Sequence, residues 1–274
     1  MSFFAANSLL CRLALKDAGM DAASFTVVRM VSAAVPLGLL MLARKKNPLR
    51  AGSFKAALAL FMYMLFFSFA YLQLPAATGT LVLMVLVQAV TLCYGSISGN
   101  KAHWRQLAGI AVAVCGVVVL LWPGLAPPPA ASCLMMCAAG AAWAVYSILG
   151  RKASDPALHT AGNFIRCLPL AIPLLPFCAA PPANGLFYAI LSGALASGFG
   201  YILWYWLVAR LSVATTAVVQ LSAPFLTMLG AAMLLAEPIT AHLLISAVIV
   251  LLGIAVAELR AQQPGSRQLP ENRP

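Results

Sequence analysis

The sequence predicts an all-α membrane protein with ten transmembrane helices, arranged as two inverted five-helix repeats around a central cavity. Three observations predict this fold class: the composition, the spacing of the apolar runs, and an internal similarity between the two halves. Hydrophobic residues make up 63% of the 274 residues and charged residues only 8%, whereas a soluble domain carries about 25% charged residues. So few charges cannot cover a water-soluble surface of this size, and most of the surface must therefore face lipid.

Ten apolar runs, delimited by charged residues, Pro and Gly, are the expected transmembrane helices. A span needs about 20 apolar residues, and the runs cover 2–16, 23–43, 56–73, 76–97, 105–122, 130–150, 160–178, 185–208, 212–236 and 239–258. The run at 2–16 lacks a basic leading segment and a small-residue cleavage site, which favours a first span over a signal peptide. The domain division is then 1–125, 126–260 and a disordered cytoplasmic tail at 261–274.

The cations indicate the orientation of these spans. The net charge is +11, but the Lys and Arg residues gather in alternate connections, as the positive-inside rule produces, rather than in a nucleic-acid-binding patch. With the N-terminus inside, the outer connections carry only Lys16. We therefore expect a multi-pass protein of a bacterial inner membrane with both termini cytoplasmic and no nucleic-acid partner. The predicted cytoplasmic cations are Arg44, Lys45, Lys46, Arg50, Lys55, Lys101, Arg105, Arg151, Lys152, Arg210, Arg260, Arg267 and Arg273.

The two halves of the sequence match each other in a shared register. A shift of 137 residues places Arg29 on Arg166 and Pro36 on Pro173. The same shift also aligns Leu74 with Leu211, Ala77 and Thr78 with Ala214 and Thr215, and Gly116 with Gly253. Because each half has an odd number of spans, the second copy must enter the membrane upside down. Inverted repeats of this kind are typical of transporters, whose substrate site lies near mid-membrane between the halves.

Several short motifs resemble the drug/metabolite transporter superfamily, specifically the bacterial EamA-type permeases and their exporters of aromatic and other amino acids. The motifs are Ala-Ala-Asn-Ser at 5–8, Arg29, Ala-Trp-Ala-Val-Tyr at 142–146, Arg166, Leu-Ser-Val-Ala-Thr-Thr at 211–216, Gln220, Pro224, Glu237 with Pro238, and Gly253. The family's Pro and Gly-Glu of the fourth helix are replaced by Val87 and by Gly99 with Asn100. The resemblance implies that the spans at 2–16, 56–73, 76–97, 130–150, 185–208 and 212–236 surround a cavity. It also implies export rather than uptake.

Candidate substrate-binding residues lie on the expected cavity helices. Aromatic residues recur at helical spacing, which is also typical of lipid-facing packing or an interfacial belt. Buried amides bind zwitterions or hold helices together by interhelical hydrogen bonds, and both readings stay open. The candidates are Asn7, Tyr63, Phe67, Tyr71, Gln88, Trp143, Tyr146, Tyr201, Trp204 and Gln220. Arg29 and Arg166 could bind a substrate carboxylate, but an interfacial or carbonyl-binding structural role is favoured.

The acidic residues bear on energy coupling. All six, Asp17, Asp21, Asp155, Glu237, Glu258 and Glu271, fall in connections, at span ends or in the tail. A proton- or sodium-coupled carrier usually keeps an ionisable group inside the membrane. We therefore expect facilitative transport, either diffusion or exchange.

Motifs for catalysis, metal binding or a cofactor are not found. The sequence lacks HExxH, GxSxG, a P-loop and a dinucleotide fingerprint, and Cys133 with Cys137 makes a poor metal site. We thus expect no enzyme activity, no catalytic residue, no metal and no cofactor. The expected function is a carrier that exports small metabolites, foremost amino acids, by alternating access. A lipophilic-cation efflux carrier, or a membrane enzyme or scaffold, remains the alternative, and the oligomeric state stays open, with a monomer compatible with the pattern.

Overall fold

The computed structural model describes residues 1–99, 103–122, 129–151, 153–208 and 213–258, and these residues form helices and no strand. Five helical stretches are long and apolar enough to cross a bilayer: α2 (Ala22–Ala43), α4 (Ala76–Ile97), α5 (Trp104–Leu121), α6 (Ala130–Gly150) and Ala183–Trp204. The last stretch combines α8 (Ala183–Ile190), a π-helical segment (Leu191–Phe199) and the start of α9 (Gly200–Val208). The predicted tail at 261–274 and the predicted domain boundary at 125/126 lie outside the described residues.

Four further helices and one broken helix complete the described part of the chain. They are α1 (Ser2–Arg12), which continues into a π-helical turn (Leu13–Asp17), α3 (Phe54–Ala70), α10 (Val213–Leu234) and α11 (Ala241–Glu258). The run expected at 160–178 is a broken helix, in which α7 (Pro156–Cys167) meets a 3-10 segment (Pro169–Phe177) at an angle of 44°. Three prolines in that segment lack the N–H that an α-helix needs, which explains the break.

Local chemistry sets where several helices begin. The side chains of Asp21, Ser53 and Asp155 accept hydrogen bonds from the backbone N–H groups of the first turns of α2, α3 and α7. Each cap satisfies a donor that has no partner inside its helix. Prolines immediately precede α4, α6 and α8. These caps and prolines explain why the observed bounds lie within three residues of most expected ones.

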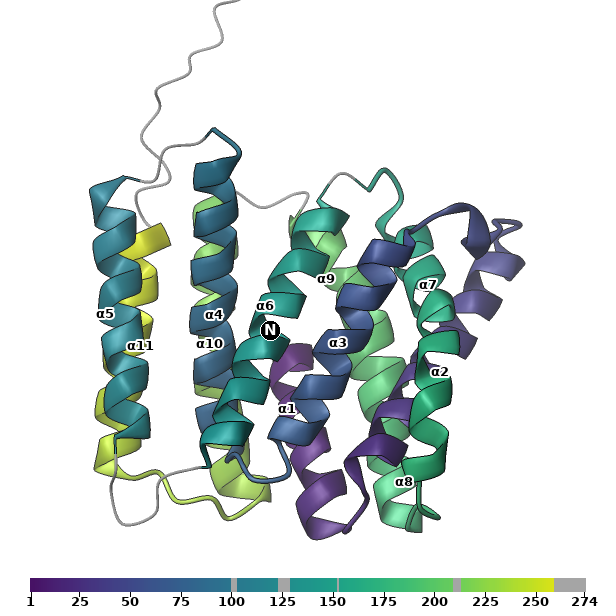
Figure 1. Cartoon of the computed structure of the whole chain (residues 1–274), viewed down its shortest axis with the longest axis horizontal. Helices are drawn as coiled ribbons and strands as arrows, with labels where there is room; N and C mark the ends of the chain where they lie inside the picture. Colours follow the sequence, from purple (N-terminus) through teal and green to yellow (C-terminus); the bar gives the residue numbers. More distant parts are fainter. Residues whose placement is uncertain (100–102, 123–128, 152, 209–212, 259–274) are drawn as a thin grey trace, which may run out of the picture.

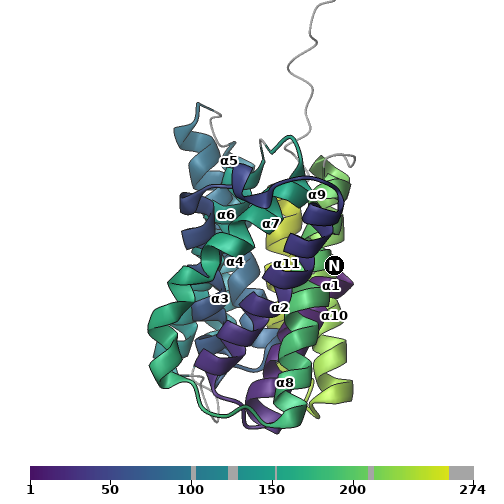
Figure 2. The ribbon, with the colours of Figure 1, turned by 90° about the vertical axis from the view of Figure 1, so that its right-hand side faces the viewer.

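The helices lie alongside one another as a bundle (Figures 1 and 2). α3 packs against α6 and α7, and α4 packs against α6 and α10. α2 packs against α7, α8 and the π-helical segment, while α1 packs against α10 and the same segment. α5 and α11 pair closely at one edge of the molecule (Figure 1). The N-terminus lies part-way along the bundle (Figures 1 and 2), so the sidedness of the two termini stays a prediction.

The outside of the bundle is apolar, as lipid exposure requires. Large hydrophobic side chains are exposed along most helices, including Leu39, Leu134, Val118 and Leu252. Exposed apolar surface on this scale is not found on soluble monomers. The protein is thus a multi-pass helical membrane protein. The largest buried cluster joins α1 to α4 with α6 to α9, and a smaller one joins α4, α5, α10 and α11.

Candidate functional site

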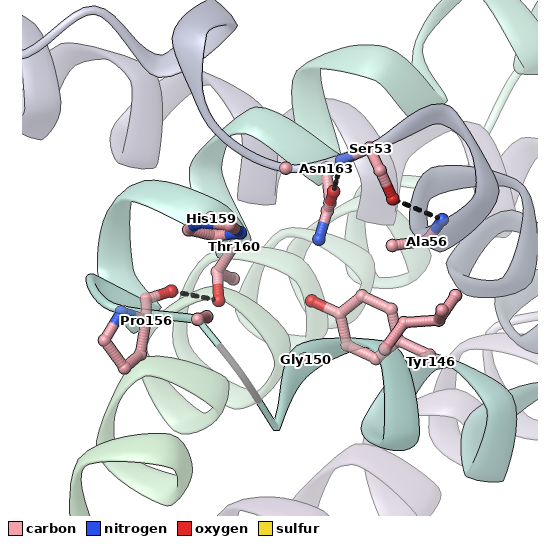
Figure 3. A pocket seen from close by; sticks show the side chains of 11 residues that line it. Ser53, Ala56, Tyr146, Gly150, Pro156, His159, Thr160 and Asn163 are labelled. Carbon is pink, nitrogen blue, oxygen red and sulfur yellow. Dashed lines mark hydrogen bonds between the residues drawn. The ribbon is translucent and has the colours of Figure 1, made fainter.

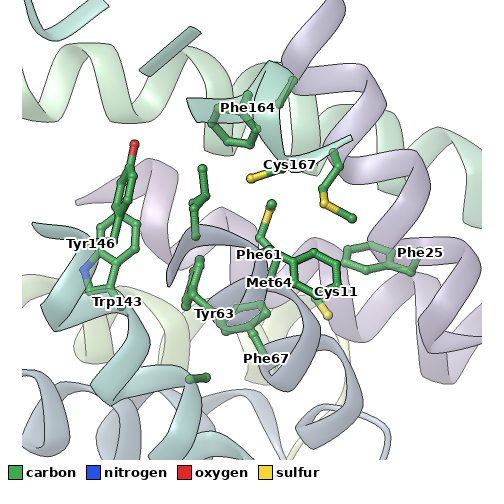
Figure 4. Close-up of a cluster of buried hydrophobic side chains, with 14 of the residues drawn as sticks. Cys11, Phe25, Phe61, Tyr63, Met64, Phe67, Trp143, Tyr146, Phe164 and Cys167 are labelled. Carbon is green, nitrogen blue, oxygen red and sulfur yellow. The ribbon is translucent and has the colours of Figure 1, made fainter. Parts of the chain in front are cut away.

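An aromatic cluster occupies the middle of the bundle. It consists of Phe4, Tyr63, Phe67, Trp143, Tyr146, Phe164, Tyr201 and Trp204, contributed by α1, α3, α6, α7 and α9. Figure 4 shows five of these side chains among the surrounding core residues. The sequence candidates Tyr63, Phe67, Trp143, Tyr146, Tyr201 and Trp204 are therefore brought together, and all of them are buried.

Trp143 is the centre of this cluster. Its ring centroid lies 4.8 Å from that of Tyr201, 4.9 Å from Tyr63, 5.5 Å from Tyr146 and 5.6 Å from Phe4. These separations fall in the range where aromatic rings attract each other beyond simple area burial. The rings are tilted or edge-on to Trp143, so they close the centre of the bundle against water.

Arg29 of α2 lies against the cluster and is fully buried. Its Nε donates to Ser197 Oγ at 3.0 Å, and one terminal nitrogen lies 3.3 Å from the Tyr201 hydroxyl and 3.5 Å from the Tyr63 hydroxyl. The guanidinium carbon is 5.1 Å from the Phe67 ring centroid, a distance at which cation–π attraction operates. The other terminal nitrogen has no hydrogen-bond partner. Sequence reasoning favoured a structural role for this arginine and left it out of the site.

Arg166, the residue that matches Arg29 in the internal repeat, has a different environment. Its guanidinium donates to the backbone carbonyls of Leu49, Ala51 and Gly162 at distances from 2.5 to 3.0 Å. It therefore fastens α7 to the connection between α2 and α3. The carbonyl-binding role expected for Arg166 agrees with these contacts.

Asn7 and Tyr71 join the cluster to the rest of the bundle. The Asn7 amide donates to the Tyr63 hydroxyl at 3.3 Å and accepts from Ser192 at 2.7 Å, so both ends of its side chain are paired. The Tyr71 ring lies 4.6 Å from Phe67, and its hydroxyl bonds with the Ala76 carbonyl and with Thr80. Asn7 thus holds α1, α3 and the π-helical segment together.

Gln88 and Gln220 bond to each other. The Gln88 amide donates to the Gln220 side chain at 3.4 Å, which links α4 to α10. This contact is the interhelical bond that a buried amide forms to stabilise a membrane bundle.

A cavity of about 140 Å³ opens at the end of the bundle that carries the α2–α3 and α6–α7 connections. In Figure 3 the hydroxyl of Tyr146 points into this smaller cavity, toward Thr160 and the amide of Asn163. Asn163 accepts a hydrogen bond from the Ser53 N–H at 3.0 Å. Nearby, the Lys46 ammonium bonds Asp155 at 2.6 Å and holds the pKa of that carboxyl below its ordinary value.

A larger cavity of about 710 Å³ lies at the opposite end, beside the α3–α4 and α10–α11 connections. Arg12 and Glu237 line this larger cavity and form a largely buried ion pair at 3.1 Å. Arg12 also donates to the Tyr71 carbonyl at 2.9 Å, and Glu237 accepts from the first N–H of α4, that of Ala76, at 2.8 Å. The pair therefore joins three segments that are distant in the sequence.

Three residues of this site escaped the sequence reasoning, namely Phe4, Phe164 and Ser197, and a fourth, Arg29, was considered there but placed outside the site. Arg29 recurs at four-residue spacing with Phe25, Ala33 and Leu37, and all four are buried. α2 is apolar on all sides, so the residue types on this buried face resemble those on the face toward lipid. The sequence therefore offered no signal that this face points inward. Among the described residues, no group of three or more His, Cys, Asp and Glu side chains could hold a metal ion.

Comparisons with known proteins agree with this architecture. The EamA-like transporter family matches residues 130–258. An uncharacterized protein of Pseudomonas aeruginosa is 44% identical over 261 residues, which cover 93% of this chain and 91% of that protein. A probable terminal-alkyne amino-acid exporter of Streptantibioticus cattleyicolor is 29% identical over 73% of this chain and 69% of its own length.

Two further similarities are more distant. A probable amino-acid metabolite efflux pump of Escherichia coli is 25% identical over 67% of each chain. One crystal structure is similar with a TM-score of 0.66 at 23% identity, and the similarity covers 94% of this chain and 96% of that one. At that identity the likeness concerns the fold alone.

Proposed function

Because the chain belongs to the EamA-like transporter family, we propose that it exports small metabolites, foremost apolar or aromatic amino acids, across the bacterial inner membrane. In this proposal the solute moves down its gradient by alternating access, through a pathway that ten spans form as two inverted repeats. Two of the relatives above are named as a probable exporter and a probable efflux pump of amino acids or their metabolites. The direction of transport rests on that likeness.

One observation carries the proposal: a continuous row of aromatic rings runs from the smaller cavity toward the larger one. Tyr146 lines the smaller cavity, and successive ring contacts lead through Trp143, Tyr63 and Phe67 to Tyr71. Arg12, which bonds to the Tyr71 carbonyl, lines the larger cavity. An apolar or aromatic side chain would replace ring–ring contacts by similar contacts as it passes, at little cost in free energy.

The packing of the helices supports the two-repeat arrangement. Under the 137-residue correspondence, α1 matches α6, α3 matches the α8–α9 stretch, and α4 matches α10. α3 packs against α6, and its counterpart contact joins α8 and the π-helical segment to α1. Likewise α4 packs against α6 while α10 packs against α1. Such paired contacts are expected when a two-fold axis in the membrane plane relates the halves.

The placement of the acidic residues supports facilitative transport. Asp21 and Asp155 cap helices at the ends of the bundle, and Glu237 is paired with Arg12. The described carboxylates therefore lie at span ends, away from the aromatic cluster. Carriers that couple transport to protons rely on an ionisable group inside the membrane pathway, and a pH gradient is accordingly expected to leave the rate of exchange unchanged.

The test is counterflow of labelled tryptophan, phenylalanine and leucine in liposomes that contain the purified protein. Saturable exchange that unlabelled amino acids inhibit is the expected result. Trp143→Ala should raise the half-saturation concentration by up to about tenfold, since an aromatic contact contributes about 0.5–1.5 kcal/mol. The control is Trp122→Ala, because Trp122 is exposed at the end of α5.

Two results would contradict the proposal. Absence of exchange for every amino acid of a broad panel would favour a membrane enzyme or a scaffold. Preferential exchange of lipophilic cations would favour the efflux alternative, against which the buried positive charge of Arg29 argues. If the rate of amino-acid exchange changed with an imposed pH gradient, transport would not be facilitative, but the proposal of an amino-acid carrier would stand.

A further inference from the structure

The buried guanidinium of Arg29 has an incomplete set of partners. Nη1 has no hydrogen-bond acceptor, and Nη2 has only the two tyrosine hydroxyls at 3.3 and 3.5 Å, which are long for such bonds. Arginine remains charged in proteins. Neither of the two ion pairs among the described residues includes Arg29. A fully buried cation without a counterion is costly, by an amount on the order of several kcal/mol.

A purely structural role does not account for these contacts. Arg166, at the matching position of the second half, is held by three backbone carbonyls, the partners that a helix-fastening arginine is expected to find. Arg29 instead faces the side chains of Tyr63, Phe67, Ser197 and Tyr201, from α3, α9 and the π-helical segment. Nor does it extend to a membrane interface, since it is 0% exposed. The charge therefore lies in the middle of the proposed pathway.

We infer that Arg29 binds the carboxylate of the transported solute, an inference that rests on the proposed carrier function. A carboxylate supplies the negative charge that the guanidinium lacks and an acceptor oxygen for Nη1, in the planar geometry that a guanidinium pairs with best. The Tyr63 and Tyr201 hydroxyls adjoin the neighbouring nitrogen, Nη2, and are placed to donate to the carboxylate. The rings of Phe67 and Trp143 then face the apolar remainder of the solute.

The two charges of an amino acid would meet different surroundings at this site. Arg29 provides a cation for the carboxylate, whereas the described carboxylates, which could pair with an ammonium group, lie at the ends of the bundle. The solute class is therefore an aryl or alkyl monocarboxylate, and the α-ammonium group is dispensable. Amines of the same shape that lack a carboxylate should be excluded by the positive charge of Arg29.

The test uses the wild-type protein in liposomes and measures inhibition of labelled tryptophan counterflow. The competitors are 3-indolepropionate, which has only the carboxylate, and tryptamine, which has only the ammonium group. We expect 3-indolepropionate to inhibit at concentrations about tenfold or more below those of tryptamine, the ratio that one charge-assisted hydrogen bond corresponds to. Equal inhibition, or stronger inhibition by tryptamine, would overturn the inference, as would equal inhibition by chloride, which would indicate an unselective anion site.

Arg29→Gln should abolish this preference, so that the ratio of the two inhibitory concentrations falls to about one. The matched control is Arg166→Gln, which removes the same charge at the equivalent position of the other repeat and should keep the ratio. An unchanged preference in Arg29→Gln would overturn the inference. If that variant does not fold, the wild-type competitor ratio still decides.

A binding measurement distinguishes this inference from the proposed carrier function. The thermal stability of the purified protein is recorded with 3-indolepropionate and with tryptamine. Stabilisation by the carboxylate alone supports the Arg29 site even if no labelled amino acid is exchanged, in which case only the proposed transport fails. Exchange of amino acids without any carboxylate preference in either assay leaves the carrier function and refutes the Arg29 site.

Discussion

At the scale of single residues, three buried or partly buried arginines differ in how completely their guanidinium groups are paired. Arg12 bonds to Glu237 and to the carbonyls of Tyr71 and Leu72, and both terminal nitrogens of Arg166 bond to backbone carbonyls. Arg29 alone among these three buried or partly buried arginines keeps a terminal nitrogen without a partner. Incomplete pairing of a buried group usually has a functional reason. This contrast assigns a structural role to Arg12 and Arg166 and agrees with the binding role that we infer for Arg29.

Glu237→Gln should destabilise the protein, because it leaves Arg12 buried without its counterion. We expect a loss of about 3 kcal/mol, the amount typical when one partner of a buried ion pair is removed. Unfolding can be followed with a thiol-reactive dye, since Cys11 and Cys167 are buried and free in the folded protein. The double variant Arg12→Met with Glu237→Gln should recover part of the loss, and losses that simply add would contradict the assignment of the pair.

At the scale of elements, close helix contacts depend on particular glycines. A Cβ atom at Gly253 of α11 would lie 2.4 Å from the backbone nitrogen of Ala113 in α5, and one at Gly109 would lie 2.6 Å from the carbonyl oxygen of Gly253. Backbone cannot yield as a flexible side chain can. Small residues of this kind let membrane helices approach closely. By contrast, the Gly95 and Gly99 pair does not form such a contact, since a Cβ at either position meets nothing within 4 Å.

Gly253→Ala should separate α5 from α11 and lower the free energy of unfolding by about 1–3 kcal/mol, the usual effect of overpacking. Gly95→Ala is the matched control, because it adds the same methyl group to open space within α4. It should be neutral or stabilise slightly through helix propensity. Dye-monitored unfolding measures both variants, and equal effects of the two substitutions would refute the close α5–α11 contact.

At the scale of the whole molecule, the two cavities lie at opposite ends of the bundle with a closed aromatic cluster between them. Passage of a solute would therefore require the rings to rearrange, as the proposed alternating access demands. The Arg12–Glu237 pair, whose side chains are 6% and 11% exposed, ties the end with the larger cavity, whereas the Lys46–Asp155 pair, whose side chains are 50% and 30% exposed, ties the other end. Exposed pairs contribute little to stability, so we expect the end with the smaller cavity to open more readily.

The predicted orientation can be tested by cysteine labelling in spheroplasts. In a variant whose own accessible cysteines are replaced by serine, Lys16→Cys should react with a membrane-impermeant maleimide in intact spheroplasts. Lys46→Cys should react only after permeabilisation, because Lys16 lines the larger cavity whereas Lys46 lies in the α2–α3 connection at the opposite end of the bundle. Labelling of both from the same side would contradict the orientation expected from the positive charges.

Composition and apolar periodicity were sufficient to predict the membrane class, the helical fold and nearly every helix boundary. Lipid leaves few alternatives to a helix for a long apolar segment, so local sequence determines those features. The break at Pro169–Phe177 was the main departure, and its prolines were visible in the sequence. Most of the aromatic candidates lie together in the structure, on helices that the family resemblance placed around the centre, and their role in binding a solute stays a prediction.

Only the tertiary structure decided which face of each apolar helix points inward. In a soluble helix polar residues mark the outer face, but a membrane helix is apolar on both sides. For this reason the sequence did not distinguish Arg29, which meets the aromatic cluster, from Arg166, which binds backbone carbonyls. Nor could it tell that Gln88 and Gln220 bind one another. Those assignments depend on how the two halves pack. The contacts that decide them join residues more than a hundred positions apart, which local sequence does not determine.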